Sequence, residues 1–406
     1  MGAWPTIPIT ISFSSGNGLS NVITALEHPN RVSRINVCLF RSHWGNIAAL
    51  MQEPFPMLTH LSIAFHFRNE STIPDGLFGG SALLLQHLDL RNVSFPALQT
   101  FLLSATNLVN LSIRRISQTG YISPEAMVLH VATLQKLEIL DIEFSDMPFL
   151  PDAILPPLTR TILPALRNFS YSGECKYLED FISRIDTPKL NSVTIQYWEG
   201  AISINFDAPQ LSEFINRSER FKRSLSRYCK IMVDHDDRVV SFCIGSTTSE
   251  RWGPKPGLSL CLSKCVEDEL LHFTNILGIR SPILSNVVHC TIDSYLSRIY
   301  TEPWVDPLGW DEFPWPRLLR QLSSAKTLFV AKDSVSLISH ALLYLSREMT
   351  VREMTAEVFP ALKLLCLEGQ PTSSLDRFLA ARMESGHPVT FVHAKEEFEE
   401  KLKSYL

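Results

Sequence analysis

The sequence lacks a long uninterrupted apolar run and a recognisable secretion signal. No stretch approaches the roughly 18 consecutive apolar residues that a bilayer-spanning helix needs. The first residues, Met1-Gly2-Ala3-Trp4-Pro5, have neither the basic nor the apolar region of a signal peptide. We therefore expect an intracellular protein, cytoplasmic or nuclear, that has no membrane partner.

An excess of charge of one sign is also missing. The chain has 37 Lys and Arg against 42 Asp and Glu, a formal net charge of -5. This balance gives no general attraction to nucleic acid, so no nucleic-acid partner is expected. The densest basic run, residues 217–230, has little aromatic interleaving, which favours a solvated helix face over a phosphate-binding patch.

Motifs for metal binding and catalysis are absent as well. The eight cysteines are scattered, and the only close pair, Cys261 and Cys265, has no second pair to complete a zinc site. We expect the cysteines to be buried free thiols in a reducing compartment. The turn at residues 234–237 has metal-ligand residue types, but four consecutive residues do not easily converge on one ion. No phosphate-binding loop, dinucleotide fingerprint, HExxH or GxSxG motif occurs, so we predict no metal, no cofactor and no enzymatic activity.

What the sequence does contain is a repeated spacing, apolar-x-x-apolar-x-apolar, seen most clearly in residues 137–142. The last three of these residues alternate, which predicts a strand with one buried face. Successive repeats begin 21 to 29 residues apart, the range of leucine-rich repeats. Their first positions are Val32, Leu58, Leu85, Leu108, Leu137, Leu166, Leu190, Leu211 and Val239.

Segments between the expected strands show helical spacing, so the repeats predict an α/β solenoid. Parallel strands would line its concave face and helices its convex face. We expect a single solenoid over residues 1–406, regular in 1–215, irregular with longer repeats in 216–406, and capped by a helix at 394–406. The Trp- and Pro-rich residues 303–316 are expected to form an ordered loop. The expected helices are 19–28, 95–105, 123–135, 177–185, 266–277, 334–347 and 375–384.

Several motifs resemble one protein family. They are Trp315-Pro316-Arg317-Leu318-Leu319, residues 325–330, residues 358–369, Phe378-Leu379-Ala380-Ala381-Arg382, Ser385-Gly386-His387-Pro388, and residues 208–215 in mid-chain. They resemble the repeats of F-box/leucine-rich-repeat proteins of mushroom-forming fungi. The resemblance implies a substrate-recognition subunit of a cullin-type ubiquitin ligase, in which an F-box holds the adaptor and the repeats hold the target.

Nothing resembling an F-box precedes the first expected helix, which begins at Leu19. Two functions therefore stay open. The first is target recognition for the ligase, with the cullin-ligase adaptor as a partner only if an F-box is supplied upstream. The second is an F-box-less scaffold with no ligase role. In both, the partner is a protein target.

The polar positions between the strand apolars predict the binding surface. If the apolar residues point into the core, the residues between them point onto the concave face. Arginines beside acidic residues there suit an extended protein segment that carries charges of both signs. The alternative is that they are the outward polar residues that any soluble sheet requires. The candidate protein-binding residues are His60, His87, Asp89, Arg91, Asn110, Arg114, Ile139, Asp141, Glu143 and Gln196.

His60 and His87 occupy equivalent positions in successive repeats and are expected to be neighbours. A metal-binding pair and a pH-sensing pair are open interpretations. Ordinary solvated histidines are favoured over both.

Overall fold

The computed structural model describes residues 7–14, 18–66, 71–80, 82–145, 159–197, 209–225, 227–234, 239–245, 257–263, 284–295, 314–352, 359–368, 372–393 and 395–402. The chain divides into two compact units, unit 1 (Met1–Asn191) and unit 2 (Ser192–Leu406). Both are α/β, and their main-sheet strands are mostly parallel. In neither unit do the described strands close into a barrel. The expected α/β class is confirmed at this level.

Unit 1 is built on parallel strands that lie in chain order. The order is β1 (Ile9–Ser14), β2 (Val32–Leu39), β3 (His60–Phe65), β5 (His87–Arg91), β7 (Asn110–Ile116), β8 (Ile139–Phe144) and β10 (Asn168–Gly173). Each strand pairs in parallel with the next. Each repeat from residue 32 to residue 173 thus adds one strand beside the previous one.

Strand β8 shows how the repeat spacing produces one buried face. Leu140, Ile142 and Phe144 are buried, whereas Ile139, Asp141 and Glu143 between them stay partly exposed. Burying such a side chain contributes about 1.5–3 kcal/mol. The same alternation recurs in β3 and β10, so the predicted orientation of the repeat positions is confirmed in these strands.

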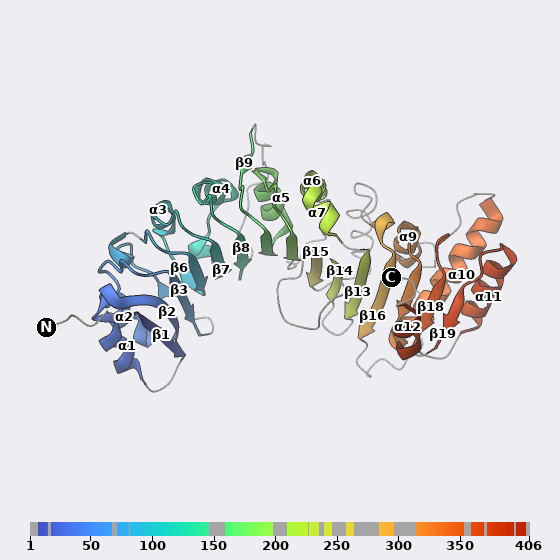
Figure 1. Ribbon diagram of the computed structural model, residues 1–406, viewed down its shortest axis with the longest axis horizontal. Coiled ribbons are helices and arrows are strands. Elements are labelled where there is room, and N and C mark those ends of the chain that lie inside the picture. Colours follow the sequence, from blue (N-terminus) through green and yellow to red (C-terminus); the bar gives the residue numbers. More distant parts are fainter. Residues whose placement is uncertain are drawn as a thin grey trace. The chain divides into compact units, whose positions relative to one another are not determined.

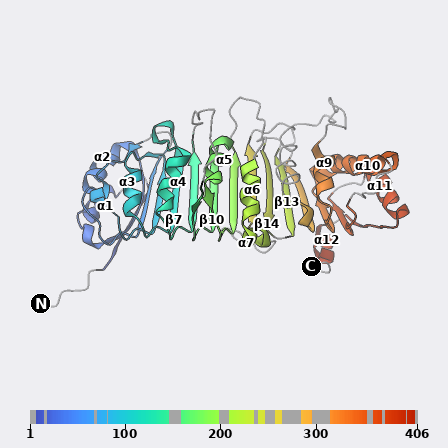
Figure 2. The ribbon, with the colours of Figure 1, turned by 90° about the horizontal axis from the view of Figure 1, so that it is seen from above.

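The helices of unit 1 lie along one face of this sheet. Figure 1 shows α3, α4 and α5 on that face, and Figure 2 shows α1 to α5 in line along it. Helix α4 begins where the sequence predicted, because the Ser123 hydroxyl accepts a hydrogen bond from the Ala126 amide and Pro124 fills the first turn. The bounds are α1 (Leu19–Leu26), α2 (Arg41–Leu50), α3 (Leu98–Ser104), α4 (Pro124–Ala132) and α5 (Cys175–Ser183).

Short elements complete the connections of unit 1. Two ladders of two strands each pair β4 (Ser71–Thr72) with β6 (Val93–Ser94) and β9 (Thr161–Ile162) with β11 (Ile185–Asp186). Three 3-10 turns occur among the described residues, η1 (Pro29–Arg31), η2 (Leu77–Gly80) and η3 (Gln118–Gly120).

Unit 2 departs from the expected all-parallel order. Its strands run β12 (Ser192–Tyr197), β15 (Gly257–Ser263), β14 (Val239–Gly245), β13 (Tyr228–Asp234), β16 (His289–Tyr295), β17 (Thr327–Val330), β18 (Leu364–Leu367) and β19 (Thr390–Val392). Strand β14 is antiparallel to both its neighbours. Only four residues separate β13 from β14, whereas a parallel crossover needs about a dozen or more. The expected strand from Val239 is present, but the parallel direction that the solenoid implied for it was wrong.

Two further expectations for unit 2 were wrong. Leu211 begins no strand but lies in α6, because Leu211, Phe214 and Ile215 are buried at helical spacing. The apolar-x-x-apolar pattern fits both kinds of element. Residues 314–316 belong to α9 and not to a loop; a proline is tolerated in the first helical turn, where its missing N–H would have had no partner.

The described helices of unit 2 are α6 (Pro209–Arg217), α7 (Glu219–Ser224), α9 (Pro314–Gln321), α10 (Val335–Arg352), α11 (Ser373–Glu384) and α12 (Lys395–Leu402), with 3-10 turns η5 (Leu284–Asn286) and η7 (Lys332–Ser334). Of these, α10, α11 and α12 lie where the sequence predicted helices, at 334–347, 375–384 and 394–406. Phe398 of α12 is buried in one cluster with Phe329, Cys366 and Val392, as expected of a helix that covers the last strands. The expected helix 266–277, residues 303–313 and the turn residues 235–237 lie outside the described residues.

Candidate protein-binding face

The sheet of unit 1 has a second face that none of the described helices of unit 1 covers (Figure 1). We call it the open face. Strand pairing places its side chains in three rows that cross the strands, at the spacing of about 4.8 Å between neighbouring strands. Row 1 is Arg34, His60, His87, Asn110, Ile139 and Asn168; row 2 is Asn36, Ser62, Asp89, Ser112, Asp141 and Ser170; row 3 is Cys38, Ala64, Arg91 and Arg114.

The structure brings nine of the ten candidate residues together on this face. Eight lie in the three rows, and Glu143 lies one pleat beyond Asp141 on β8. The tenth, Gln196, is exposed on β12 of unit 2. The candidate site is therefore described within unit 1 alone.

The acidic pair on β8 is already paired with arginines of β7. Arg114 Nε lies 2.7 Å from Asp141 Oδ2, and the Ser112 hydroxyl donates to the same oxygen at 3.2 Å. Arg115 Nε lies 3.8 Å from Glu143 Oε1. Such partly exposed pairs contribute at most about 1 kcal/mol each. The predicted neighbourhood of opposite charges is present, but these charges neutralise one another.

Arg115 was missed by sequence reasoning because a backbone irregularity places it. The β7–β8 register shifts between Ile113 and Ile116, and Arg115 has a φ of 54°. The irregularity lets two consecutive residues, Arg114 and Arg115, both reach acids of the open face. The sequence signal for this irregularity was the pair of successive polar residues, Arg114 and Arg115, in a strand that otherwise alternates.

Two cations remain for a partner. Arg34 and Arg91 are exposed, and neither makes an ion pair with another described residue. Arg34 was also missed, although it stands between the apolar residues of the first repeat. Asp89 accepts a hydrogen bond from the Ser62 hydroxyl at 3.4 Å through Oδ2, while its buried Oδ1 has no partner among the described residues.

His60 and His87 are neighbours, as expected, and their rings stack at 4.2 Å between centroids with an interplanar angle of 16°. Burial lowers the pKa of His60, and the charges of His87 and Arg34 lower it further. Burial and Arg34 also lower the pKa of His87. Both imidazoles are therefore mainly neutral near pH 7.

The stacked geometry argues against the metal interpretation. A ring nitrogen binds a metal through a lone pair in the ring plane, and the in-plane lone pairs of two parallel rings do not converge on one point. Nor do the described residues contain any group of three or more His, Cys, Asp and Glu placed to hold a metal ion.

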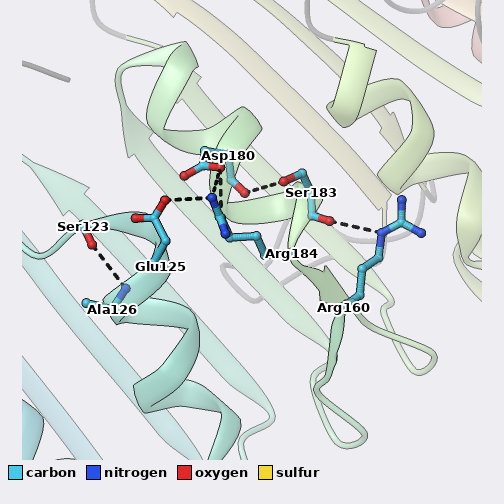
Figure 3. Close-up of polar contacts among 7 residues, drawn as sticks. All are labelled: Ser123, Glu125, Ala126, Arg160, Asp180, Ser183 and Arg184. Atoms are coloured by element: carbon cyan, nitrogen blue, oxygen red, sulfur yellow. Dashed lines mark hydrogen bonds and ion pairs between the residues drawn. The ribbon is translucent and has the colours of Figure 1, made fainter. Parts of the chain in front are cut away.

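A second polar cluster lies between helices α4 and α5, away from the open face (Figure 3). Arg184 donates to Glu125 at 2.7 Å and to Asp180 at 2.9 Å. The Asp180 side chain is only 1% exposed, and burial raises its pKa although Arg184 opposes the shift. Glu125, Asp180 and Arg184 are paired with one another, so we interpret the cluster as a structural contact between α4 and α5.

Unit 1 therefore belongs to a broad class, the open α/β arrays of parallel strands, and its described helices cover one face of the sheet and leave a polar face uncovered. Among the described helices, none combines the length and apolar character needed to cross a bilayer. A scan against protein-family models gives no match, and neither does a search of curated proteins.

Proposed function

We propose that unit 1 is a leucine-rich-repeat solenoid whose open face binds an extended segment of a partner protein. The observation that carries this proposal is the open face itself, three in-register polar rows with two exposed arginines, Arg34 and Arg91, that have no ion-pair partner in the described residues. These two guanidinium groups can pair with acidic groups of a partner.

The dimensions of the open face suit a peptide. From β2 to β10, rows 1 and 2 cross six strands, a width of about 24 Å at about 4.8 Å between neighbouring strands. An extended segment of about seven residues spans this width at about 3.3 Å per residue. Charge complementarity at such a surface sets orientation and specificity more than affinity.

For the cellular role, we propose target recognition in a cullin-type ubiquitin ligase inside the cell, with no catalysis by this chain. This part rests on the sequence resemblance to F-box/leucine-rich-repeat proteins. The alternative is a scaffold without a ligase role. The test mixes purified full chain with the cullin-ligase adaptor, because stoichiometric binding would contradict a scaffold without a ligase role.

The binding face itself is tested by charge reversal. We expect Arg34→Glu combined with Arg91→Glu to reduce capture of the partner at least tenfold in quantitative cross-linking from cell extract. Arg377→Glu, at an exposed position on α11 of unit 2, is the matched control and should leave capture unchanged. Equal loss with both variants, or no loss with the double variant, contradicts the proposal.

A further inference from the structure

Row 1 places two stacked imidazoles directly beside an exposed arginine. Arg34, His60, His87 and Asn110 stand on four adjacent strands, β2, β3, β5 and β7, at the same level of the sheet. All four side chains can donate hydrogen bonds once the imidazoles are protonated. At about 4.8 Å between neighbouring strands, the four side chains form a row of donors about 14 Å long.

Hydrogen bonding couples the tautomer of His60 to Thr59. The Thr59 hydroxyl oxygen lies 3.0 Å from the Ser33 carbonyl oxygen and 2.8 Å from His60 Nδ1, and its one proton goes to one of these two acceptors. When it goes to Ser33, the hydroxyl accepts from Nδ1–H, and Nε2 is the bare nitrogen that takes up a second proton.

The surroundings of the pair favour a neutral state in the absence of a ligand, because burial and the charge of Arg34 on β2 lower the pKa of both rings. The other charged groups on the neighbouring strands are further off: Asp89 on β5 lies one row away, and Arg91 on β5 and Arg114 on β7 lie two rows away. Arg114 is also engaged by Asp141. An anionic group seated on row 1 would offset the repulsion among Arg34 and the two rings.

We infer that row 1 binds a carboxylate side chain of an acidic protein segment, and that His60 and His87 take up protons when the segment binds. This inference rests on the proposed function, since it names the chemistry of the partner that the open face takes. The carboxylate would lie against Arg34 and the protonated Nε2 of His60. Asp or Glu side chains of the partner are therefore the expected anchors at this end of the face.

The linkage has a definite sign. A bound carboxylate stabilises the protonated imidazoles, so the pKa of each ring is higher in the complex than in the free protein. Between these two values, affinity rises by up to about tenfold per pH unit of acidification for each proton taken up. Above the value in the complex and below the value in the free protein, affinity does not depend on these protons.

The direct test follows the histidine resonances of the full chain, labelled at histidine, in NMR titrations from pH 8.5 to 5.5. The probe is acetyl-Gly-Asp-Gly-amide, and acetyl-Gly-Asn-Gly-amide is its uncharged match, each on the order of 50 mM because one carboxylate contact is weak. We expect only the Asp peptide to raise the pKa of His60 and His87. His130 on α4, whose pKa is lowered by burial on the helix-covered side, is the internal control and should not respond. Identical titrations of His60 and His87 with both peptides overturn the inference.

Variants sharpen the test. His60→Gln with His87→Gln should abolish the pH dependence of Asp-peptide binding, and Arg34→Gln should weaken that binding severalfold. Asp89→Asn removes the nearest facing acid and should strengthen it. Unchanged pH dependence in the double histidine variant also overturns the inference.

The two proposals fail separately. Loss of the histidine response with partner capture still dependent on Arg34 and Arg91 contradicts only the inference about row 1. A normal histidine response with capture independent of these arginines contradicts only the proposed function.

Discussion

Replacing Arg184 with leucine should destabilise unit 1 by about 3–5 kcal/mol near pH 7.5, the usual cost of leaving one member of a buried ion pair unpaired. Asp180 would lose its 2.9 Å partner in an environment where its side chain is 1% exposed. Glu125 would lose its 2.7 Å contact as well, but it is 49% exposed and can be solvated. Most of the loss therefore comes from Asp180.

Urea unfolding measures the loss of stability, and hydrogen exchange of the α4 and α5 amides reports on the contact between these helices. Arg167→Leu is the matched control. Arg167 lies 3.6 Å from Glu138, with both side chains about 45% exposed, so its loss should cost at most about 1 kcal/mol. The double variant Asp180→Leu with Arg184→Leu should recover much of the lost stability, because it leaves no buried charge.

The pH dependence gives an independent check of the same reasoning. The raised pKa of Asp180 means that folding favours its protonated form, which contributes stability at low pH and loses it as pH rises through the folded value. Without Arg184 this pKa should rise further, so the cost of Arg184→Leu should shrink as pH falls from 7.5 to 5. A cost equal to that of Arg167→Leu, or one that grows on acidification, would refute the reasoning.

Three further perturbations test the core. Leu140→Ala in β8 should cost about 2–5 kcal/mol in urea unfolding, and a cost under 1 kcal/mol would mean that this strand is not packed as described. Tyr177→Phe removes a buried hydroxyl that has no partner among the described residues, so the free energy of unfolding should stay equal or rise by up to about 1 kcal/mol; a large loss would reveal a hidden partner. Burial, with smaller contributions from Glu368 and Glu397, raises the pKa of the Cys366 thiol to about 12, so iodoacetamide at pH 8 should label it only after unfolding, and rapid labelling of the native protein would contradict this.

The regular part of the fold could be predicted because its repeat is a local pattern. In residues 137–142 the alternation of apolar and polar residues fixes strand, buried face and outward residues together. The same local reasoning failed at Leu211, where apolar residues three and four apart form the buried face of a helix. It failed again at β14, where the direction of a strand depends on the length of the connection before it and not on the strand's own residues.

The candidate site was only partly predictable for a related reason. The alternation placed His60 and His87 correctly, because register follows from equivalent repeat positions. Which charges pair depends on backbone detail that sequence does not display. Arg115 reaches Glu143 only because of the left-handed conformation at one residue. Asn92 has the same conformation and donates a buried hydrogen bond to the Phe65 carbonyl at 2.8 Å, another contact that no periodicity indicates.

The strand order also has a consequence for synthesis on the ribosome. In unit 1 each strand finds its partner in the preceding repeat, as His87 does with His60, so the sheet can grow one strand at a time as the chain emerges. Strand β12 must wait longer, because Ser192 pairs with Gly257, 65 residues further on. The added loop-closure cost is only about 0.8 kcal/mol, but the delay leaves that edge of β12 unpaired during translation. Unit 2 is therefore where a nascent chain should most need a chaperone.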